Sequence, residues 1–269
     1  MSRCVARSRK AAHHFDFGKN YIPRDGAGKS TAYGARFFSC GEFDWPISLV
    51  PIRLNCIVPT MAQSKTCRVM LFAKAPVAGV VKTRLIPVLG AESAAQLHRR
   101  LMVRSLETLI KADVGPVEIC CAPDASHPFF VDCQQRFGIA LTTQRDGDLG
   151  ERMRHAFERT LLSASSALIV GADCPSMSAD DIRAAATHLA SHTAALIPAD
   201  DGGYVLIGVR QSHPDMFAGI DWGNATVLAA QRECFRALGW RWHEGATRWD
   251  VDRPEDLARL AELDPPIAF

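Results

Sequence analysis

Apolar and polar positions recur with two different periods between about residue 67 and residue 263. Short apolar runs bounded by glycine, proline or charged residues indicate buried strands, and apolar residues spaced by three or four positions indicate amphipathic helices. The pattern predicts strands at residues 69–73, 117–122, 138–142, 167–172, 194–198, 204–209 and 240–243. Helices are predicted at residues 92–111, 128–136 and 149–161, from residue 178 onward, and at residues 224–238 and 254–263. Strands and helices therefore alternate, as in an α/β protein.

The sheet is predicted to contain both parallel and antiparallel strands. Residues 167–172 read ALIVGA, a fully apolar run that is typical of a strand covered on both faces of a parallel sheet. Residues 194–198 and 204–209 are so close in the chain that they can form a hairpin but not a parallel crossover. We therefore expect a mixed sheet with helices between its strands.

Residues 1–60 differ from the rest of the chain. They show no sustained helix or strand period, four prolines interrupt them, and they hold nine Lys or Arg against four Asp or Glu. We predict that residues 1–60 are a disordered tail or an extension upstream of a natural start at Met61, and that residues 61–269 form a single α/β domain. The DGAGKST segment at residues 25–31 is not a P-loop, because position 23 is proline instead of glycine and no strand precedes it.

Composition narrows the class of protein. The chain is 48% hydrophobic and 22% charged, which is typical of a soluble globular protein. A formal net charge of +2 indicates no general affinity for nucleic acid, and no apolar run approaches the ~20 residues that a membrane span requires. The nine cysteines include no C-x-x-C pair, which favours reduced thiols in the cytoplasm over a zinc site.

The first predicted strand leads into a loop with the features of a phosphate site. This glycine loop (residues 74–84) contains Gly79 and three cations, Lys74, Lys82 and Arg84. Glycine lets backbone N–H groups approach a phosphate closely, and the cations supply the opposite charge. A strand, such a loop and a long helix hold a nucleotide in many α/β proteins. The alternative is an ordinary strand–helix connection whose cations are solvated.

Acidic residues at the ends of later elements are candidate metal ligands. Asp173 directly follows the apolar strand at residues 167–172, and ligands bind beyond the carboxyl ends of strands in open α/β sheets. A carboxylate there can hold Mg²⁺ against substrate phosphates, although an Asx-turn before a proline is the alternative. Asp250 and Asp252 are the other candidates, and Asp252 with Glu255 is also predicted to cap the last helix.

Two glycine-containing segments are further candidates for ligand contact. Residues 200–204 read DDGGY and could form either a ligand contact or only a hairpin turn. Residues 144–152 place two glycines near the start of a helix, where backbone contact with a ligand and a flexible loop are equally compatible. Cys174 is not expected to be a nucleophile, because the neighbouring Asp173 disfavours its thiolate.

Five motifs in this order resemble the DUF2064 family of glycosyltransferase-A-like proteins. They are FAKAPVAGVVKTRL, GDLGERM, GADCPSM, DGGYVLIG and DVDRPEDL, and together they span about residues 67–263. The resemblance implies a nucleotide-diphospho-sugar transferase fold, which is a Rossmann-like three-layer α/β/α sandwich with a mixed sheet. The first half is also similar to 2-phospholactate guanylyltransferase and to molybdopterin nucleotidyltransferases. One departure is the segment Trp222–Thr226, where the threonine of the family's Trp-Ser/Gly-Thr run is displaced.

The resemblance and the residues together imply an enzyme that acts on nucleotides. We expect a nucleotide-sugar-dependent glycosyltransferase that uses Mg²⁺ or Mn²⁺ and an unidentified small-molecule acceptor. The alternatives are a nucleotidyltransferase that releases pyrophosphate and a non-catalytic nucleotide-binding protein. The expected catalytic residues are Lys82 and Asp173. The expected metal ligands are Asp173, Asp250 and Asp252. The expected nucleotide contacts are Ala73, Lys74, Gly79, Lys82, Thr83, Arg84, Asp148, Asp201, Gly202, Gly203 and Trp222.

Overall fold

The computed structural model describes residues 67–268. All of these residues belong to the same compact unit of the chain. The predictions for residues 1–60 lie outside the described part of the chain.

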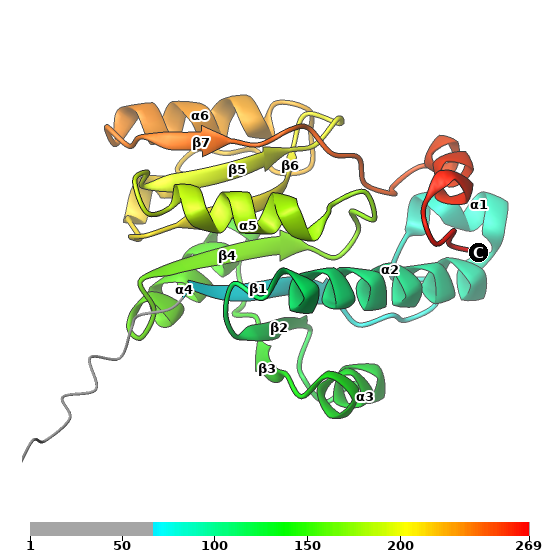
Figure 1. The fold of residues 1–269 in the computed structure, drawn as a ribbon. Helices are drawn as coiled ribbons and strands as arrows, with labels where there is room; N and C mark the ends of the chain where they lie inside the picture. Colours follow the sequence, from blue (N-terminus) through cyan, green and yellow to red (C-terminus); the bar gives the residue numbers. More distant parts are fainter. Residues whose placement is uncertain (1–66, 269) are drawn as a thin grey trace, which may run out of the picture. The chain divides into compact units, whose positions relative to one another are not determined.

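The described residues form a seven-stranded sheet with the strand order β3-β2-β1-β4-β6-β5-β7 (Figure 1). The strands are β1 (Cys67–Lys74), β2 (Val117–Ala122), β3 (Ala140–Thr143), β4 (Ser166–Gly171), β5 (Ala194–Pro198), β6 (Tyr204–Val209) and β7 (Trp242–Glu244). Strands β1 to β4 are parallel, whereas β6 runs antiparallel to both β4 and β5. The mixed sheet and the β5–β6 hairpin confirm the sequence predictions.

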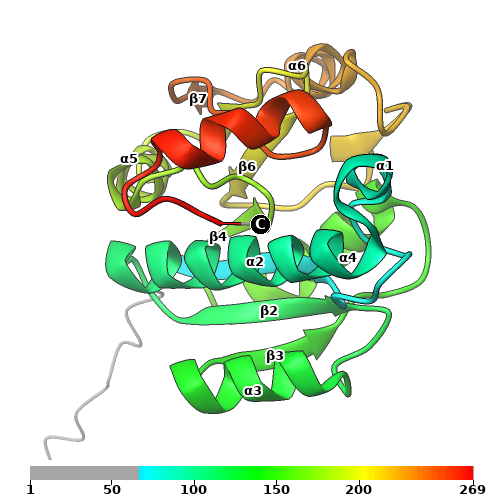
Figure 2. The same cartoon turned by 90° about the vertical axis from the view of Figure 1, so that its right-hand side faces the viewer.

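Helices cover both faces of the sheet (Figures 1 and 2). The helices are α1 (Ile86–Leu89), α2 (Ala91–Ala112), α3 (Pro128–Phe137), α4 (Leu149–Leu161), α5 (Ala179–His188) and α6 (Val227–Ala237). Helices α2, α3 and α5 pack on one face around Leu106, Phe130 and Ile182, and α4 and α6 pack on the other around Phe157 and Phe235. These three layers confirm the predicted α/β/α sandwich.

Three short 3₁₀ helices complete the described chain, and two of them were not predicted. They are η1 (Thr83–Leu85), η2 (Pro214–Phe217) and η3 (Pro254–Glu262). Elements as short as η1, η2 and α1 contain too few residues to show a hydrophobic period. The predicted last helix is present as η3, but its hydrogen bonds follow the tighter 3₁₀ pattern.

The predicted cap of the last helix is wrong. Asp252 and Glu255 were expected to cap it, but the Asp256 carboxylate accepts hydrogen bonds from the backbone N–H groups of Asp252 and Arg253, at 2.9 Å and 2.7 Å. The reason is that Arg253 is still extended and Pro254 begins the helix, so the capping position lies one residue later than predicted. The Asp252 side chain is thereby left for another partner.

The order of the strands creates a crevice between β1 and β4. From β1 the chain moves to β2 and β3 on one side and then returns to β4 on the other side. Lys74 at the end of β1 is level with Ala122, and Phe72 is level with Gly171 at the end of β4. Segments that follow β1 and β4 therefore meet at one edge of the sheet, and such a switch point is where open α/β sheets bind ligands.

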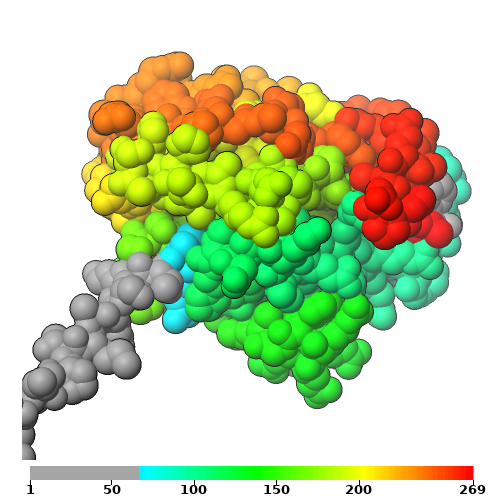
Figure 3. Space-filling view, viewed as in Figure 1, coloured from blue at the N-terminus to red at the C-terminus, as the bar shows by residue number. Residues whose placement is uncertain are grey.

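The C-terminal segment packs at the same edge. A separate apolar cluster forms there between the glycine loop, α2 and the end of the chain. It contains Leu85, Leu97 and Leu101, together with Val251 just before η3 and Leu260 of η3. Figures 2 and 3 show the C-terminal residues, in red, against α2. The guanidinium group of Arg104 on α2 donates to the carbonyl oxygen of Pro265 at 3.0 Å. The end of the chain thus supports the region that follows β1.

Among the helices of residues 67–268, none combines the length and the apolar character that a membrane crossing requires.

A cluster of histidines makes the stability of the fold dependent on pH. The rings of His188 and His243 stack with centroids 3.4 Å apart, and the His192 ring lies 5.7 Å from His188. Burial lowers the pKa of His243, and the nearby His188 and His192 lower this pKa further.

We expect this cluster to destabilise the protein in acid. Because the folded-state pKa of His243 lies below the unfolded value of about 6.5, its contribution to stability is present above that pH and is lost as the pH falls. The melting temperature should therefore fall between about pH 8 and about pH 5 by more in the parent protein than in His243→Gln. Parallel pH profiles of the two proteins, measured by circular dichroism, would refute this assignment.

Candidate active site

The glycine loop leaves β1 and turns sharply at Gly79. Gly79 has a φ of +82°, and a Cβ at this position would meet nothing within 4 Å. Glycine is therefore required here by the left-handed backbone conformation and not by close packing. Lys82 also has a positive φ, of 50°, which directs the end of the loop back into the protein. The loop thus exposes Val80 to solvent while it buries the Lys82 side chain.

Lys82 joins the glycine loop to two other segments. Its side chain is only 4% exposed, and Nζ lies 2.9 Å from Oδ2 of Asp173. The same ammonium donates to the carbonyl oxygen of Val251 at 2.6 Å. The residues after β4 and the residues before η3 therefore meet at this one lysine.

His98 of α2 is a member of the site that the sequence interpretation missed. It is buried, Nδ1 lies 3.2 Å from Oδ1 of Asp173, and Nε2 lies 3.0 Å from the carbonyl oxygen of Lys74. A carbonyl oxygen can only accept a hydrogen bond, so the contact with Lys74 requires a hydrogen on Nε2. His98 therefore contacts the start of the glycine loop and the end of β4 at once.

The Asp173 carboxylate stays ionised because of these two partners. Removal from water acts to raise the pKa of Asp173, but the Lys82 ammonium and the His98 ring outweigh it and hold this pKa well below its usual range. The Asp173 side chain remains 39% exposed, so it can still be reached from solvent.

The late acidic motif lies beside Asp173, as its predicted role requires. The backbone N–H of Val251 donates to the carbonyl oxygen of Asp173 at 2.9 Å. Asp252 pairs with Arg84 of the glycine loop. Burial, together with the nearby carboxylates of Asp201 and Asp173, raises the pKa of Asp250 to about 6. Negative charge is therefore concentrated at this edge of the sheet.

Lys82, His98, Asp173 and Asp252 border a cavity of about 500 Å³, whereas the predicted site residues Asp250 and Gly79 are not among the residues that line it. Its lining includes Ala73, Lys74, Lys82, Thr83, Arg84, His98, Gln144, Leu149, Arg152, Asp173 and Asp252. A smaller cavity of about 280 Å³ shares Lys74, Val80, Gln144 and Arg152 with it and is otherwise walled largely by apolar residues such as Val77 and Pro123. The two cavities thus form a polar chamber with a less polar extension.

Gln144 and Arg152 line the cavity at the two ends of the candidate segment 144–152, but neither was predicted individually as a site residue. Gln144 follows β3, and its Nε2 donates to the carbonyl oxygen of Cys120 at 2.7 Å, which leaves its Oε1 as an acceptor. Arg152 lies on the first turn of α4, and its Nε donates to the carbonyl oxygen of Gly147 at 2.8 Å. Their positions just after a strand and just inside a helix were the available signal.

Asp148 and Trp222 do not line the large cavity. Asp148 caps α4, and its carboxylate accepts from the backbone N–H of Glu151 at 2.8 Å. Trp222 packs edge-on against Phe217 and touches α4 at Gly150. Both residues therefore support α4, which in turn carries Arg152.

The β5–β6 turn also contributes no residue to the lining of the large cavity. The Asp201 carboxylate in this turn nevertheless helps to raise the pKa of Asp250. Asp201 accepts a hydrogen bond from the backbone N–H of Gly203 at 2.8 Å, which is an Asx-turn. Gly202 packs against Ala225, where an added Cβ would lie 2.2 Å from a carbonyl oxygen. The structure thus gives Asp201 and Gly202 roles in the turn itself.

The donor groups at this edge suit a divalent cation that is shared with a phosphate. Mg²⁺ is usually bound by one or two carboxylates, with waters and substrate phosphates completing its shell. Asp173 and Asp250 supply such oxygens, and the raised pKa of Asp250 reflects excess negative charge that a cation would offset. Within residues 67–268, no three His, Cys, Asp or Glu side chains form a metal cage by themselves.

Asp250→Asn should increase stability at neutral pH. Because the folded-state pKa of Asp250 is raised to about 6, its contribution to stability is present below the unfolded value of about 3.9 and is lost as the pH rises through 6. The asparagine variant should therefore melt above the parent at about pH 8, and the difference should shrink at about pH 5. If the variant melted below the parent at both pH values, the claim that burial and neighbouring carboxylates destabilise the ionised Asp250 would be wrong.

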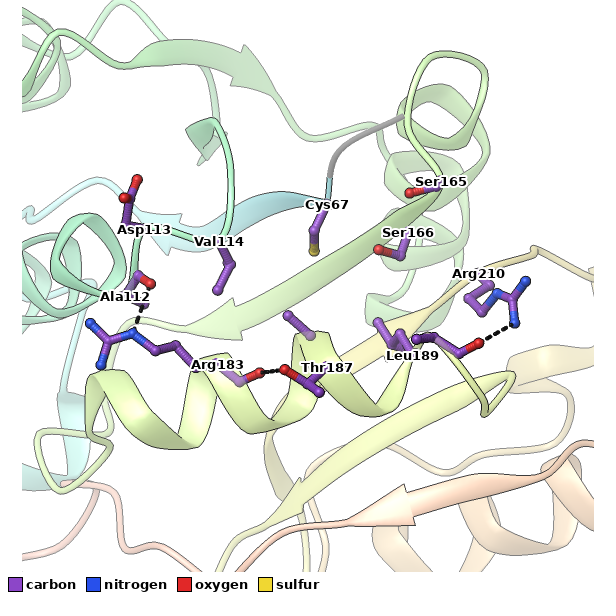
Figure 4. Close-up of a pocket in the computed structure, with 12 residues that line it drawn as sticks. Cys67, Ala112, Asp113, Val114, Ser165, Ser166, Arg183, Thr187, Leu189 and Arg210 are labelled. Carbon is purple, nitrogen blue, oxygen red and sulfur yellow. Dashed lines mark hydrogen bonds between the residues drawn. The ribbon is translucent and has the colours of Figure 1, made fainter. Parts of the chain in front are cut away.

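Another cavity, of about 710 Å³, lies where β1 and β4 begin, at the opposite end of these strands (Figure 4). Arg183 donates to the carbonyl oxygens of Ala112 and Lys111, and Arg210 donates to that of Ala190. Its arginines therefore bind backbone at the ends of helices, and it contains none of the site residues predicted from the sequence.

A family model and a solved structure are similar to this chain. The model of a family described as "Uncharacterized protein conserved in bacteria (DUF2064)" matches residues 105–224. A candidate nucleotide-diphospho-sugar transferase from Desulfovibrio desulfuricans G20 is 33% identical, with a TM-score of 0.64 over 70% of this chain and 82% of that one. A search of curated proteins found no match.

More distant solved structures share the fold alone. A cytidylyltransferase from Leptospira borgpetersenii serovar Hardjo-bovis (strain JB197) is 11% identical, with a TM-score of 0.53 over 76% of this chain and 88% of that one. A nucleotidyl transferase from Methanothermobacter thermautotroptrophicus is 14% identical, with a TM-score of 0.50 over 73% of this chain and 96% of that one. The expected nucleotide-diphospho-sugar transferase fold is confirmed.

Proposed function

Because the chain belongs to the DUF2064 family and is a transferase with the nucleotide-diphospho-sugar transferase fold, we propose that it transfers a glycosyl group from a nucleotide sugar to a small-molecule acceptor. The observation that carries this proposal is the meeting of cations and carboxylates at the β1–β4 switch point. Lys82 Nζ and Asp173 Oδ2 lie 2.9 Å apart there, beside a cavity of about 500 Å³. Transfer from a nucleotide sugar needs positive side chains that bind the phosphates and negative side chains that bind a cation.

The cationic side of the cavity would hold the diphosphate. Lys74, Arg84 and Arg152 all line it, and they come from β1, the glycine loop and α4. Charged donors from three separate elements can bind several phosphate oxygens at once, and charge-assisted bonds are the stronger kind.

The smaller cavity suits the base of the nucleotide. Its apolar walls at Val77, Val80 and Pro123 fit a flat heteroaromatic ring, and Gln144 and Asp146 provide hydrogen-bonding groups at its rim. A nucleotide would then lie with its base in the smaller cavity and its phosphates in the larger one.

The acidic side of the cavity would hold the metal. Asp173, with Asp250 or Asp252, would supply the carboxylate ligands for Mg²⁺ or Mn²⁺. When bound, such a cation stabilises the negative charge that develops on the departing nucleoside diphosphate. His98 and Lys82 each contact one of the two Asp173 carboxylate oxygens and so fix the position of this side chain. The acceptor would enter near Asp201 and Trp222, beyond the acidic edge.

Nucleotidyl transfer needs the same phosphate and metal groups, and it differs in what leaves. Glycosyl transfer releases a nucleoside diphosphate, whereas nucleotidyl transfer releases pyrophosphate from a nucleoside triphosphate. Product analysis therefore separates the two reactions. A binding protein would release neither product.

Arg84→Ala should weaken nucleotide binding about tenfold or more, because a charge-assisted hydrogen bond contributes roughly 1.5–3 kcal/mol. Calorimetric titration with nucleoside di- and triphosphates measures this change. The control is Arg99→Ala, since the Arg99 guanidinium lies 5.2 Å from the Phe129 ring centroid and outside both cavities. Equal affinities in the two variants would show that the phosphates do not bind at the glycine loop.

A further inference from the structure

Two side chains of the protein contact the oxygens of the Asp173 carboxylate. Lys82 Nζ lies 2.9 Å from Oδ2, and His98 Nδ1 lies 3.2 Å from Oδ1. Both oxygens are therefore already bound to hydrogen donors of the protein. A divalent cation that approached Asp173 would meet the Lys82 ammonium at contact distance from the same carboxylate, and like charges so close repel strongly.

Lys82 is held in this position by more than its charge. Its side chain is 4% exposed, its backbone is in the left-handed region, and its ammonium also donates to the carbonyl oxygen of Val251 at 2.6 Å. An ammonium has three hydrogens, so two are used within the protein and one is left. Lys82 also borders the cavity in which the phosphates would lie, so a phosphate oxygen there is within its reach.

We propose, on the basis of the proposed function, that Lys82 is an internal counter-ion that makes metal binding depend on the nucleotide. Without nucleotide, the ammonium of Lys82 neutralises Asp173 and competes with a divalent cation for that carboxylate. A nucleotide phosphate offers the ammonium a second anion, which weakens its hold on Asp173. The carboxylate then becomes available to the cation, so nucleotide and metal strengthen each other's binding, and by linkage they do so equally.

The test measures Mn²⁺ binding to the apo protein by electron paramagnetic resonance, with Mn²⁺ as the only ligand. Lys82→Met keeps the length of the side chain and removes its charge, so it should bind Mn²⁺ at least about tenfold tighter than the parent. Lys82→Arg keeps the charge and should bind Mn²⁺ within about threefold of the parent. Saturating inorganic pyrophosphate should reduce the difference between the parent and Lys82→Met to less than about threefold.

Two results would overturn the proposal. One is a Lys82→Met protein that binds Mn²⁺ no tighter than the parent, and the other is a gain that Lys82→Arg shares. If Lys82→Met does not fold, Lys82→Gln serves in its place, because an amide keeps a donor toward Asp173 without the charge, and the same tenfold gain is expected. The counter-ion role and the proposed function fail separately, since tighter Mn²⁺ binding without turnover refutes only the transferase, and turnover with equal Mn²⁺ affinities refutes only the counter-ion.

Discussion

Asp173→Asn is expected to remove metal-dependent transfer and to lower the melting temperature. Asparagine keeps the size of the side chain but loses the charge that would ligate the metal, and an NH2 donor replaces one carboxylate oxygen and faces Lys82 or His98. Activity should fall by about a hundredfold or more, which is the scale of a lost electrostatic stabiliser. Stability should also fall, because the Lys82 ammonium, only 4% exposed, loses its anionic partner. Turnover and thermal unfolding measure the two effects.

Asp252→Asn is the matched control for the effect of this variant on stability. Asp252 also lines the cavity, but its partner Arg84 is 58% exposed, so the loss of their ion pair should hardly change stability. If Asp173→Asn turned over Mg²⁺-nucleotide like the parent, Asp173 would not be a metal ligand. If it kept the melting temperature of the parent, the pairing with Lys82 would contribute nothing to the fold.

Gly202→Ala is expected to have the largest effect on stability at the edge of the site. Gly202 has a φ of +92°, and an added Cβ would lie 2.2 Å from the carbonyl oxygen of Ala225. The obstacle is backbone, and the Gly202 carbonyl oxygen itself accepts from the backbone N–H of Leu228 at 2.9 Å, so neither segment can move freely. Overlap and backbone strain together should reduce the free energy of unfolding by about 2–4 kcal/mol, as measured in urea.

Gly203→Ala separates this packing effect from ligand contact. The nearest atom to a Cβ there is Oδ1 of Asp201, at 3.2 Å, on a side chain that can move, and φ is not in the left-handed region. The cost should stay below about 1 kcal/mol. If Gly202→Ala were as stable as Gly203→Ala but had lost nucleotide binding, the glycine would serve the ligand and not the turn.

The sequence predicts the elements of this fold well where the hydrophobic period is long. Helix α4 and strands β2, β5 and β6 begin and end at the predicted residues. The start of α5 was also predicted, since the helix was expected from residue 178 onward and Ser178 and Asp181 form a capping box there. The short elements η1, α1 and η2 were not predicted, because three or four residues are too few to show a hydrophobic period. The cap of η3 was misplaced because the extended Arg253 delays the first turn.

Site residues that follow strands were predicted from the sequence. His98, which a helix contributes, was missed. Lys82 and Asp173 were placed together because the ends of β1 and β4 share one edge of the sheet, and the structure brings them to 2.9 Å. His98 was missed because it lies on α2 among apolar residues, where a histidine carries no local signal. Only the packing of α2 on the sheet brings it to Lys74 and Asp173.

Some polar residues in motifs were also assigned to ligands although they have local partners. Asp148 caps α4, and Asp201 closes its own turn, so neither carboxylate is free of protein bonds. Such short-range bonds use the same residue types as ligand contacts, and the sequence pattern alone does not distinguish them.

The most direct test is to identify the product released from a panel of nucleotide sugars and nucleoside triphosphates with Mg²⁺. The parent protein should release a nucleoside diphosphate from one of the nucleotide sugars when a suitable acceptor is present, and Asp173→Asn should release almost none. Release of pyrophosphate from a nucleoside triphosphate would identify the reaction at this site as nucleotidyl transfer instead of glycosyl transfer. Product formation that is equal in the parent and in Asp173→Asn would contradict the placement of the reaction at the β1–β4 edge of the sheet.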